Sequence, residues 1–345
     1  FTHDSDEAFI EDYVGDVRWL LGRYGPNGDF FTENPDLPHK PVRFLEIFNE
    51  PNLWYIDRAR DDRRSHALPA DPVEREKLFR YRQDLYTRLL KACYTVIKEN
   101  WPEVTVVGFA TSGPMKLDVP FIRGIHERYP EIVNFYDILS THPYQRPTPP
   151  EGDYVRSWGS YSIAGSMAEI KEIMREAGAA DKPVWYTELC WTMEPDESSQ
   201  FSAARRPDVD RDIPRILHPA YYTRMYLWTL RLGVERMNFM AITDVDMVNV
   251  GMFDAGPPQE WRPTAIAIRN QIDLMPHPKL RSAVSDGKDN TYAWWIESDV
   301  GKAPDALGDV LAAWNIEGRT ILTVDWPDDV ESVTVVDMLG GRTQA

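Results

Sequence analysis

Short β-rich runs alternate with amphipathic helical segments over the first 276 residues. Apolar side chains in residues 6–24 recur at three- and four-residue intervals, which predicts a helix that Gly25 and Pro26 end. Helices are also expected at 72–100, 119–129, 166–177, 218–232 and 264–275, and strands at 42–48, 104–110, 135–140, 184–187 and 236–242. This alternation is typical of βα units that build a parallel sheet.

Five such strands are fewer than the eight of a closed (β/α)8 barrel. The helical segment 6–24 precedes the first strand, so the pattern corresponds to a barrel without its first three strands. We therefore predict that residues 1–276 form an α/β domain, a (β/α)8 TIM barrel whose N-terminal strands are missing from this chain. We expect both ends to be truncated, because residues 333–345 also predict a strand and a turn without a partner strand.

The pattern changes after Pro276. Four β-rich runs without helices follow, at 292–296, 310–314, 320–324 and 333–336. Polar turns such as 285–287 and 317–318 separate them. Residues 277–345 are therefore expected to form a small antiparallel β-sandwich-like accessory domain.

Composition excludes several classes of function. The formal net charge of −17 argues against nucleic acid or an anionic membrane as partner. No run approaches the roughly 18 apolar residues of a transmembrane helix, and Cys93 and Cys190 suggest neither a disulfide framework nor a metal cluster. The sequence has no Gly-x-Gly-x-x-Gly, Walker or Gly-x-Ser-x-Gly motif, so common nucleotide-binding and serine-hydrolase classes are removed. We predict no metal and no organic cofactor.

Carboxylates stand where two predicted strands end. The first strand leads into Glu50 and the fourth into Glu188. The active site of a (β/α)8 barrel lies at the C-terminal ends of its strands, so the two carboxyl groups should converge. Asn-Glu-Pro alone could equally be a capped turn, but a pair of carboxyl groups is what glycosidic cleavage requires.

Other candidates lie at the same strand ends. His142 and Tyr144 follow the third strand, and we expect them to contact substrate, although a lone histidine is more often structural. Trp54 and Trp191 are candidates to stack on the faces of sugar rings. Arg262, with Arg146, is a cation that could bind an anionic sugar, but a surface arginine is the simpler interpretation.

Three motifs carry a resemblance to a known family. Residues 44–53, Phe-Leu-Glu-Ile-Phe-Asn-Glu-Pro-Asn-Leu, resemble the fourth-strand motif of clan A glycoside hydrolases and are most similar to family 39, which includes β-xylosidases. Thr187-Glu188 resembles the seventh-strand motif, and residues 140–144 resemble the sixth. The resemblance implies that Glu50 is the acid/base and Glu188 the nucleophile of a retaining mechanism. It also implies that Asn49 contacts the sugar 2-hydroxyl, and that His142 and Tyr144 border the sugar.

The resulting hypothesis is a retaining glycoside hydrolase that cleaves O-glycosidic bonds of oligo- or polysaccharides. The sequence departs from family 39 at Met240, where the eighth strand usually carries an aromatic residue, often tryptophan. Two alternatives therefore stay open. These are a non-catalytic carbohydrate-binding protein on the same scaffold and a subunit whose barrel another chain completes. A carbohydrate substrate fits an extracellular or periplasmic compartment, but compartment, oligomeric state, sugar and linkage are not predicted.

Overall fold

The computed structural model describes residues 5–53, 56, 69–113, 117–156, 159–194, 212–244, 249–254, 260–298, 310–318, 320–326 and 332–344. The chain divides into two compact units. The first comprises Phe1–Gln145, Glu151–Leu189 and Val234–Phe239. The second comprises Arg146–Pro150, Cys190–Gly233 and Met240–Ala345.

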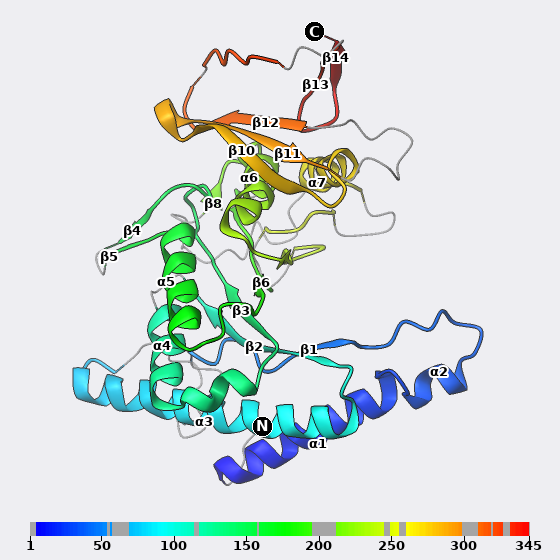
Figure 1. Cartoon of the computed structure of the whole chain (residues 1–345), viewed down its shortest axis with the longest axis vertical. Coiled ribbons are helices and arrows are strands. Elements are labelled where there is room, and N and C mark those ends of the chain that lie inside the picture. The colour runs from blue at the N-terminus through cyan, green and yellow to red at the C-terminus, as the bar shows by residue number, and fades with distance from the viewer. Residues whose placement is uncertain are drawn as a thin grey trace. The chain divides into compact units, whose positions relative to one another are not determined.

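The first unit is built on a five-stranded parallel sheet in the order β1-β2-β3-β6-β9 (Figure 1). Its strands are β1 (Phe44–Glu46), β2 (Thr105–Ser112), β3 (Ile138–His142), β6 (Val184–Tyr186) and β9 (Arg236–Met237). All five predicted strands form, and the sheet is a curled half-barrel, so a partial TIM barrel is confirmed. The last strand is shorter than the predicted range 236–242, because hydrogen bonding to β6 pairs only Arg236 and Met237.

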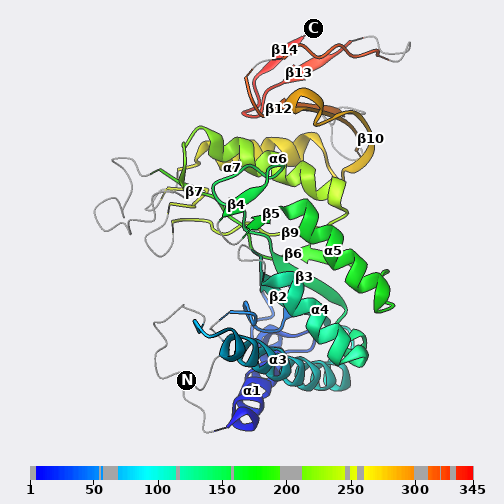
Figure 2. The same ribbon diagram turned by 90° about the vertical axis from the view of Figure 1, so that its left-hand side faces the viewer.

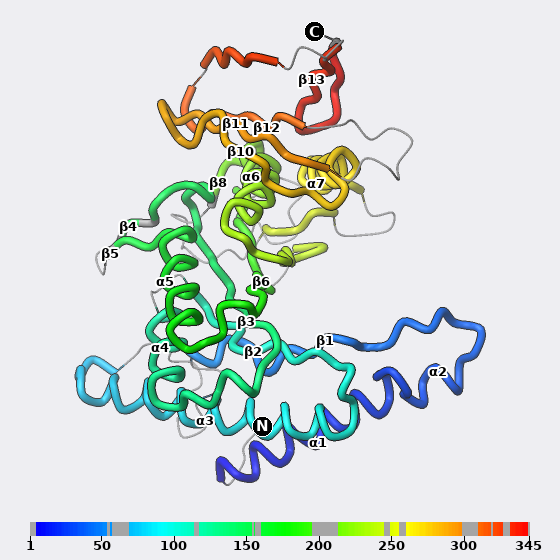
Figure 3. The backbone as a smooth tube through the Cα atoms, in the orientation of Figure 1, coloured from blue at the N-terminus to red at the C-terminus, as the bar shows by residue number. Residues whose placement is uncertain are grey.

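Helices of this unit lie beside the sheet, as Figure 2 shows, and two of them precede β1 along the chain. The unit contains α1 (Asp6–Tyr24), α2 (Asp29–Glu33), α3 (Pro72–Asn100), α4 (Asp118–Arg128), the short 3-10 helix η2 (Pro130–Asn134) and α5 (Ile163–Glu176). The tube in Figure 3 follows the passage from β2 through α4 to β3 and from there to α5 and β6. A two-stranded antiparallel hairpin, β4 (Tyr154–Arg156) and β5 (Gly159–Tyr161), precedes α5. The predicted helices therefore form within three residues of their expected ends.

Burial and capping explain why these segments take these forms. Strands β2 and β3 are buried along almost their whole length, as expected for parallel strands covered on both faces. Val107, Ile138 and Trp185 form a core cluster of the sheet. At the start of α3, the Asp71 carboxylate accepts hydrogen bonds from two backbone N–H groups of the first turn, and Pro72 follows in the first helical position.

The second unit contains helices α6 (Leu217–Leu232) and α7 (Pro263–Leu274). A parallel pair, β7 (Thr192–Met193) and β8 (Asp212–Ile213), precedes them along the chain. An antiparallel sheet has the order β10-β11-β12, formed by β10 (Lys279–Asp286), β11 (Thr291–Glu297) and β12 (Val310–Asn315), with the 3-10 turn η4 (Lys288–Asn290) between the first two. A separate hairpin consists of β13 (Thr334–Val336) and β14 (Arg342–Gln344).

Two expectations for this region are wrong. Residues 320–324 form no strand, because the run is paired with no strand among the described residues, although Leu322 and Val324 are partly buried while Ile321 is 94% exposed. The segment 333–345 does not lack a partner strand, because β14 pairs with β13 within it and Gly340, at φ 91°, takes the left-handed conformation of the turn. Strands β11 and β12 form where the runs 292–296 and 310–314 predict them, but β10 was not predicted, and part of the turn expected at 285–287 belongs to it. The sandwich and the boundary at residue 276 stay predictions.

Within the described ranges, no helix combines the length and the apolar character that crossing a membrane requires.

Candidate active site

The backbone departs from regular strand geometry just after β1 and within β2, where the register with β3 shifts between Gly108 and Thr111. Phe48 and Glu50 have φ angles of 68° and 48°, and Phe109 and Ala110 have φ angles of 84° and 42°. Residues other than glycine rarely adopt this left-handed backbone conformation, because it costs them about 1–2 kcal/mol each. Such strain persists only where neighbouring groups fix the backbone, and it is concentrated at functional sites.

Three side-chain hydroxyls accept hydrogen bonds from the backbone N–H groups of three of these residues. The pairs are Phe48 with Tyr13 at 2.9 Å, Ala110 with Ser140 at 3.0 Å, and Phe109 with Tyr86. In addition, the N–H of Glu50 donates to the carbonyl of Ala110 at 3.0 Å. The four backbone N–H groups at these positions are therefore all paired, and Glu50 is hydrogen-bonded to β2.

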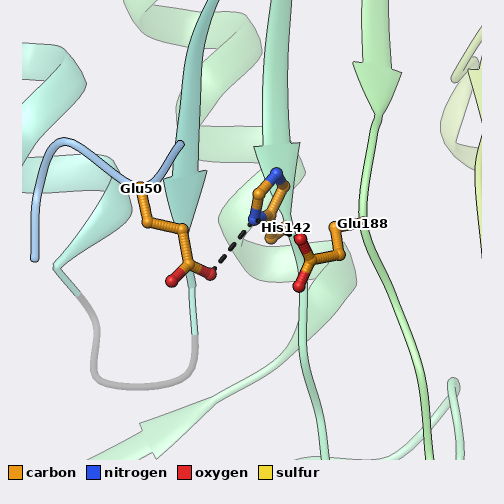
Figure 4. A group of neighbouring side chains, drawn as sticks. All are labelled: Glu50, His142 and Glu188. Carbon is orange, nitrogen blue, oxygen red and sulfur yellow. Dashed lines mark hydrogen bonds and ion pairs between the residues drawn. The ribbon is translucent and has the colours of Figure 1, made fainter. Parts of the chain in front are cut away.

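Three predicted site residues meet at the C-terminal ends of three strands. Figure 4 shows the side chains of Glu50, His142 and Glu188 pointing toward one another. His142 Nδ1 lies 3.1 Å from Glu50 Oε1 and 3.9 Å from Glu188 Oε2. A carboxylate oxygen of Glu50 and one of Glu188 lie within 4.8 Å of each other. The sequence prediction that the two carboxyl groups converge agrees with this geometry.

The two carboxyl groups have different surroundings. The Glu50 side chain is 8% exposed and its one described side-chain partner is His142, which is itself buried. The Glu188 side chain is 28% exposed and accepts a hydrogen bond from the hydroxyl of buried Tyr144. His142 Nε2 is buried and has no hydrogen-bond partner among the described residues. Glu188 is thus the more accessible carboxylate, and a tyrosine orients it.

The same three side chains are the residues that could hold a metal ion. Their candidate ligand atoms all lie within 4.8 Å of one another. Ligands of a tetrahedral zinc ion stand about 3.3 Å apart, given metal–ligand distances of about 2.0–2.2 Å. The group would have to contract to bind zinc, and the Tyr144 hydroxyl already occupies one oxygen of Glu188. The geometry therefore fits a carboxylate pair better than a metal centre.

The remaining predicted sugar contacts lie elsewhere or outside the described residues. Asn49 is exposed and lines a surface pocket of about 460 Å³ together with Tyr13, Glu46 and Phe48. No hydrogen bond between described residues joins Asn49 to Glu50 or Glu188. Trp54 lies outside the described residues.

Trp191 belongs to the core of the second unit. Its side chain is fully buried, its indole N–H donates to the carbonyl of Thr148 at 2.9 Å, and its ring meets Tyr221 and Tyr222 edge-on. A buried ring with a satisfied N–H is typical of a structural tryptophan. Its predicted role as a sugar platform therefore gains no support from its placement.

Arg262 is not the surface arginine that the sequence suggested. It is buried, and its guanidinium binds both oxygens of Asp244 at 2.8 Å and the carboxylate of Asp254 at 2.6 Å. These carboxylates raise the pKa of Arg262 above its usual value. Its charge is neutralised by two neighbouring carboxylates of the same unit, so it is a poor candidate for an anionic sugar.

Sequence analysis missed two buried polar residues beside Glu50. Asn52 belongs to the motif 44–53 but has no predicted role, and Arg82 lies in the helix predicted at 72–100. Both are almost fully buried; the Asn52 side chain pairs with the backbone of Ser112, and Arg82 donates to the carbonyl of Asn52. The available signal was a charged residue on the apolar face of a helix, which must find a partner when it is buried.

Comparison with known proteins gives matches by structure. Neither protein-family models nor curated sequences match the chain. The chain is similar to a glucosidase from Croceicoccus marinus, with 14% identity, a TM-score of 0.52, and coverage of 86% of this chain and 54% of that one. An α-L-arabinofuranosidase from Thermotoga maritima has 12% identity, a TM-score of 0.50 and coverage of 87% and 62%. A family 39 β-xylosidase from Caulobacter crescentus has 16% identity, a TM-score of 0.45 and coverage of 86% and 54%.

These similarities concern the fold. The glucosidase and the arabinofuranosidase share the arrangement of this chain at low identity. The predicted resemblance to glycoside hydrolases therefore holds at the level of the fold. The chain spans 53–62% of the length of the β-xylosidase, glucosidase and arabinofuranosidase structures that it resembles.

Proposed function

We propose that this protein is a retaining glycoside hydrolase in which Glu188 is the nucleophile and Glu50 the acid/base. The observation that carries the proposal is the approach of the two carboxylates to within 4.8 Å at the C-terminal ends of parallel strands. Retaining glycosidases hold their carboxyl groups about 5–5.5 Å apart, whereas inverting enzymes leave about 6.5–9.5 Å for a water molecule. The short separation favours direct attack by one carboxylate on the sugar.

The surroundings of each carboxyl group support the assignment of roles. A nucleophile must reach the anomeric carbon with a fixed orientation, and Glu188 is the more exposed group and is oriented by Tyr144. In the first step, Glu188 displaces the leaving group and forms a covalent glycosyl-enzyme. In the second step, water displaces Glu188 and the original configuration is restored.

Glu50 suits a group that must give up a proton and then take one back. It donates a proton to the departing oxygen in the first step and removes one from water in the second. His142 Nδ1, at 3.1 Å, can accept a hydrogen bond from protonated Glu50 or donate one to its ionised form, depending on the histidine tautomer. His142 can therefore hydrogen-bond to Glu50 in both steps of the reaction.

Steady-state kinetics with a panel of aryl glycosides test the proposal. We expect hydrolysis by the wild type and a loss of about 10²–10⁴-fold in kcat/KM for Glu50→Ala with substrates that need protonation of the leaving group. Binding of oligosaccharide without release of reducing sugar would instead indicate a carbohydrate-binding protein. A control, Glu99→Ala, removes a carboxylate from the last turn of α3 and should leave kcat/KM unchanged.

A further inference from the structure

A buried asparagine joins the turn after β1 to the end of β2. The side-chain amide of Asn52 donates to the carbonyl of Ser112 at 2.8 Å and accepts from the N–H of the same residue at 2.9 Å. Both backbone groups of Ser112 are thus paired with one side chain, as a neighbouring strand would pair them. Asn52 is fully buried, so water does not compete for these hydrogen bonds.

A buried arginine holds the same turn from the helix α3. Arg82 is 2% exposed, and its Nη1 donates to the backbone carbonyl of Asn52 at 2.9 Å. The N–H of Leu53 donates to the carbonyl of Glu50 at 2.9 Å and closes the turn. The turn is therefore fixed to β2 through a side chain and to α3 through its backbone.

These contacts surround a strained residue. Glu50 lies two positions before Asn52 and has a φ of 48°. The relaxed backbone of a residue other than glycine would move to negative φ, and this rotation would turn the side chain away from His142. The hydrogen bonds of Asn52 and Arg82 oppose that rotation, because they fix the chain directly after Glu50.

We infer that Asn52 and Arg82 form a clamp that positions the Glu50 carboxyl group for proton transfer. The inference rests on the proposed function and identifies two further positioning residues for that reaction. Neither residue acts on the substrate directly. Their effect reaches the reaction through the backbone of Glu50, and a misplacement of about 1 Å in such a group can cost on the order of 10²-fold in rate.

Substrates with different leaving groups distinguish two causes of lost activity, which are a misplaced acid and a general loss of structure. Departure of 2,4-dinitrophenolate needs no proton, whereas departure of unsubstituted phenol does. For Asn52→Ala, kcat/KM should fall about 10- to 100-fold with phenyl glycosides and less than about threefold with dinitrophenyl glycosides. Asn52→Asp, which keeps the acceptor for Ser112 but loses the donor, should show the same dependence to a smaller degree and covers the case in which the alanine variant does not fold.

Gln83→Ala is the matched control. Gln83 is the next residue of α3, is equally buried, and donates to the carbonyls of Pro120 and Phe121 at 3.3 and 3.2 Å, with no described contact to the turn after β1. Its loss should change the two classes of substrate equally. An equal loss on both leaving groups in Asn52→Ala, or a leaving-group dependence in Gln83→Ala, would overturn the clamp.

A second measurement does not depend on catalysis. Nitrogen-15 NMR of histidine-labelled protein, with the signals of His142 assigned through a His142→Gln variant, reports the hydrogen bond between Nδ1 and Glu50. We expect these signals to move in Asn52→Ala and Arg82→Ala and to stay in place in Gln83→Ala. If the wild type hydrolyses no glycoside, the proposed function fails while this measurement still decides the clamp. Unchanged His142 signals in both clamp variants would refute it.

Discussion

Each unit of the molecule contains a pair of carboxylates, and the two pairs differ in the side chains that surround them. In the second unit, Asp244 and Asp254 both bind the guanidinium of Arg262. In the first unit, Glu50 and Glu188 approach each other, and no lysine or arginine of the described residues lies within ion-pair distance of either. One pair is neutralised by a fixed cation, whereas the side-chain partners of the other among the described residues are a histidine and a tyrosine.

The difference teaches what each pair can do. A carboxylate bound bidentately by arginine is held ionised in one geometry, which stabilises a loop but removes the group from chemistry. A carboxylate that is not held by an arginine or lysine is free to form a covalent bond or to transfer a proton. The comparison supports a structural role for the Asp244–Arg262–Asp254 group and the chemical role that we propose for the Glu50–His142–Glu188 group.

The largest effect is expected from removing the proposed nucleophile. Glu188→Ala should lower kcat by at least about 10⁴-fold, because the covalent step is lost. Sodium azide should restore turnover of activated aryl glycosides and yield a glycosyl azide of inverted configuration, measured by proton NMR. Asp254→Ala, the matched change in the other pair, should leave kcat within about threefold of wild type. Near-normal activity of Glu188→Ala would contradict the proposed role of Glu188 as nucleophile.

Removing the cation of the structural pair should act on stability. Arg262→Met leaves the Asp244 carboxylate buried without its arginine, and this should lower the free energy of unfolding by about 3–5 kcal/mol. Urea denaturation followed by circular dichroism measures the loss. The control is Arg80→Met, which breaks an exposed ion pair with Glu76 one turn away in α3 and should cause little change. A loss no larger than that of the control would show that the Arg262 pair is not structural.

A third buried carboxyl group, Asp118, belongs to neither pair, and its raised pKa predicts how the free energy of unfolding changes with pH. Asp118 is fully buried, accepts a hydrogen bond from Ser166 at 2.8 Å, and has one carboxylate oxygen without a described partner. Burial raises the pKa of Asp118 to about 6, against the hydrogen bonds that lower it. A raised folded-state pKa stabilises the fold fully below the unfolded pKa near 3.8, and this stability is lost as pH rises through about 6.

The variant Asp118→Asn isolates this effect. The free energy of unfolding of Asp118→Asn relative to wild type should rise by about 3 kcal/mol between pH 3.5 and pH 7, since two pKa units correspond to about 3 kcal/mol. Urea titrations at the two pH values measure it. A difference between variant and wild type that does not change with pH would mean that Asp118 does not titrate in this window.

The smallest effect is expected from removal of metal ions. Because the Glu50–His142–Glu188 geometry fits a carboxylate pair better than a zinc site, dialysis against EDTA should leave kcat/KM within about twofold of its starting value. Activity that EDTA abolishes and zinc restores would assign these residues to a metal centre instead.

The sequence predicts elements whose signals are local. The helix 6–24 forms with the expected bounds, since its apolar spacing lies within it and the Gly25-Pro26 pair that ends it follows directly. The convergence of Glu50 and Glu188 is also predictable, because parallel strands present their C-terminal ends on one side of a barrel. Both conclusions need only the pattern and a general rule of topology.

Features that depend on distant partners could not be predicted. The strand expected at 320–324 does not form because no strand among the described residues pairs with it, and a local pattern cannot show whether a pairing strand is present. Trp191 has the flat aromatic ring on which a sugar can stack, yet its ring is buried against Tyr221 and Tyr222. The clamp on Glu50 joins Asn52 to residues 30 and 60 positions away, and no local spacing rule connects them.

The stereochemistry of the first product tests the central claim most directly. Proton NMR during hydrolysis of an activated aryl glycoside distinguishes the first-formed anomer before mutarotation. The proposed double displacement, with Glu50 and Glu188 about 5 Å apart, predicts a product with the anomeric configuration of the substrate. A first product of inverted configuration would contradict the account, since it would require a water molecule between the two carboxyl groups.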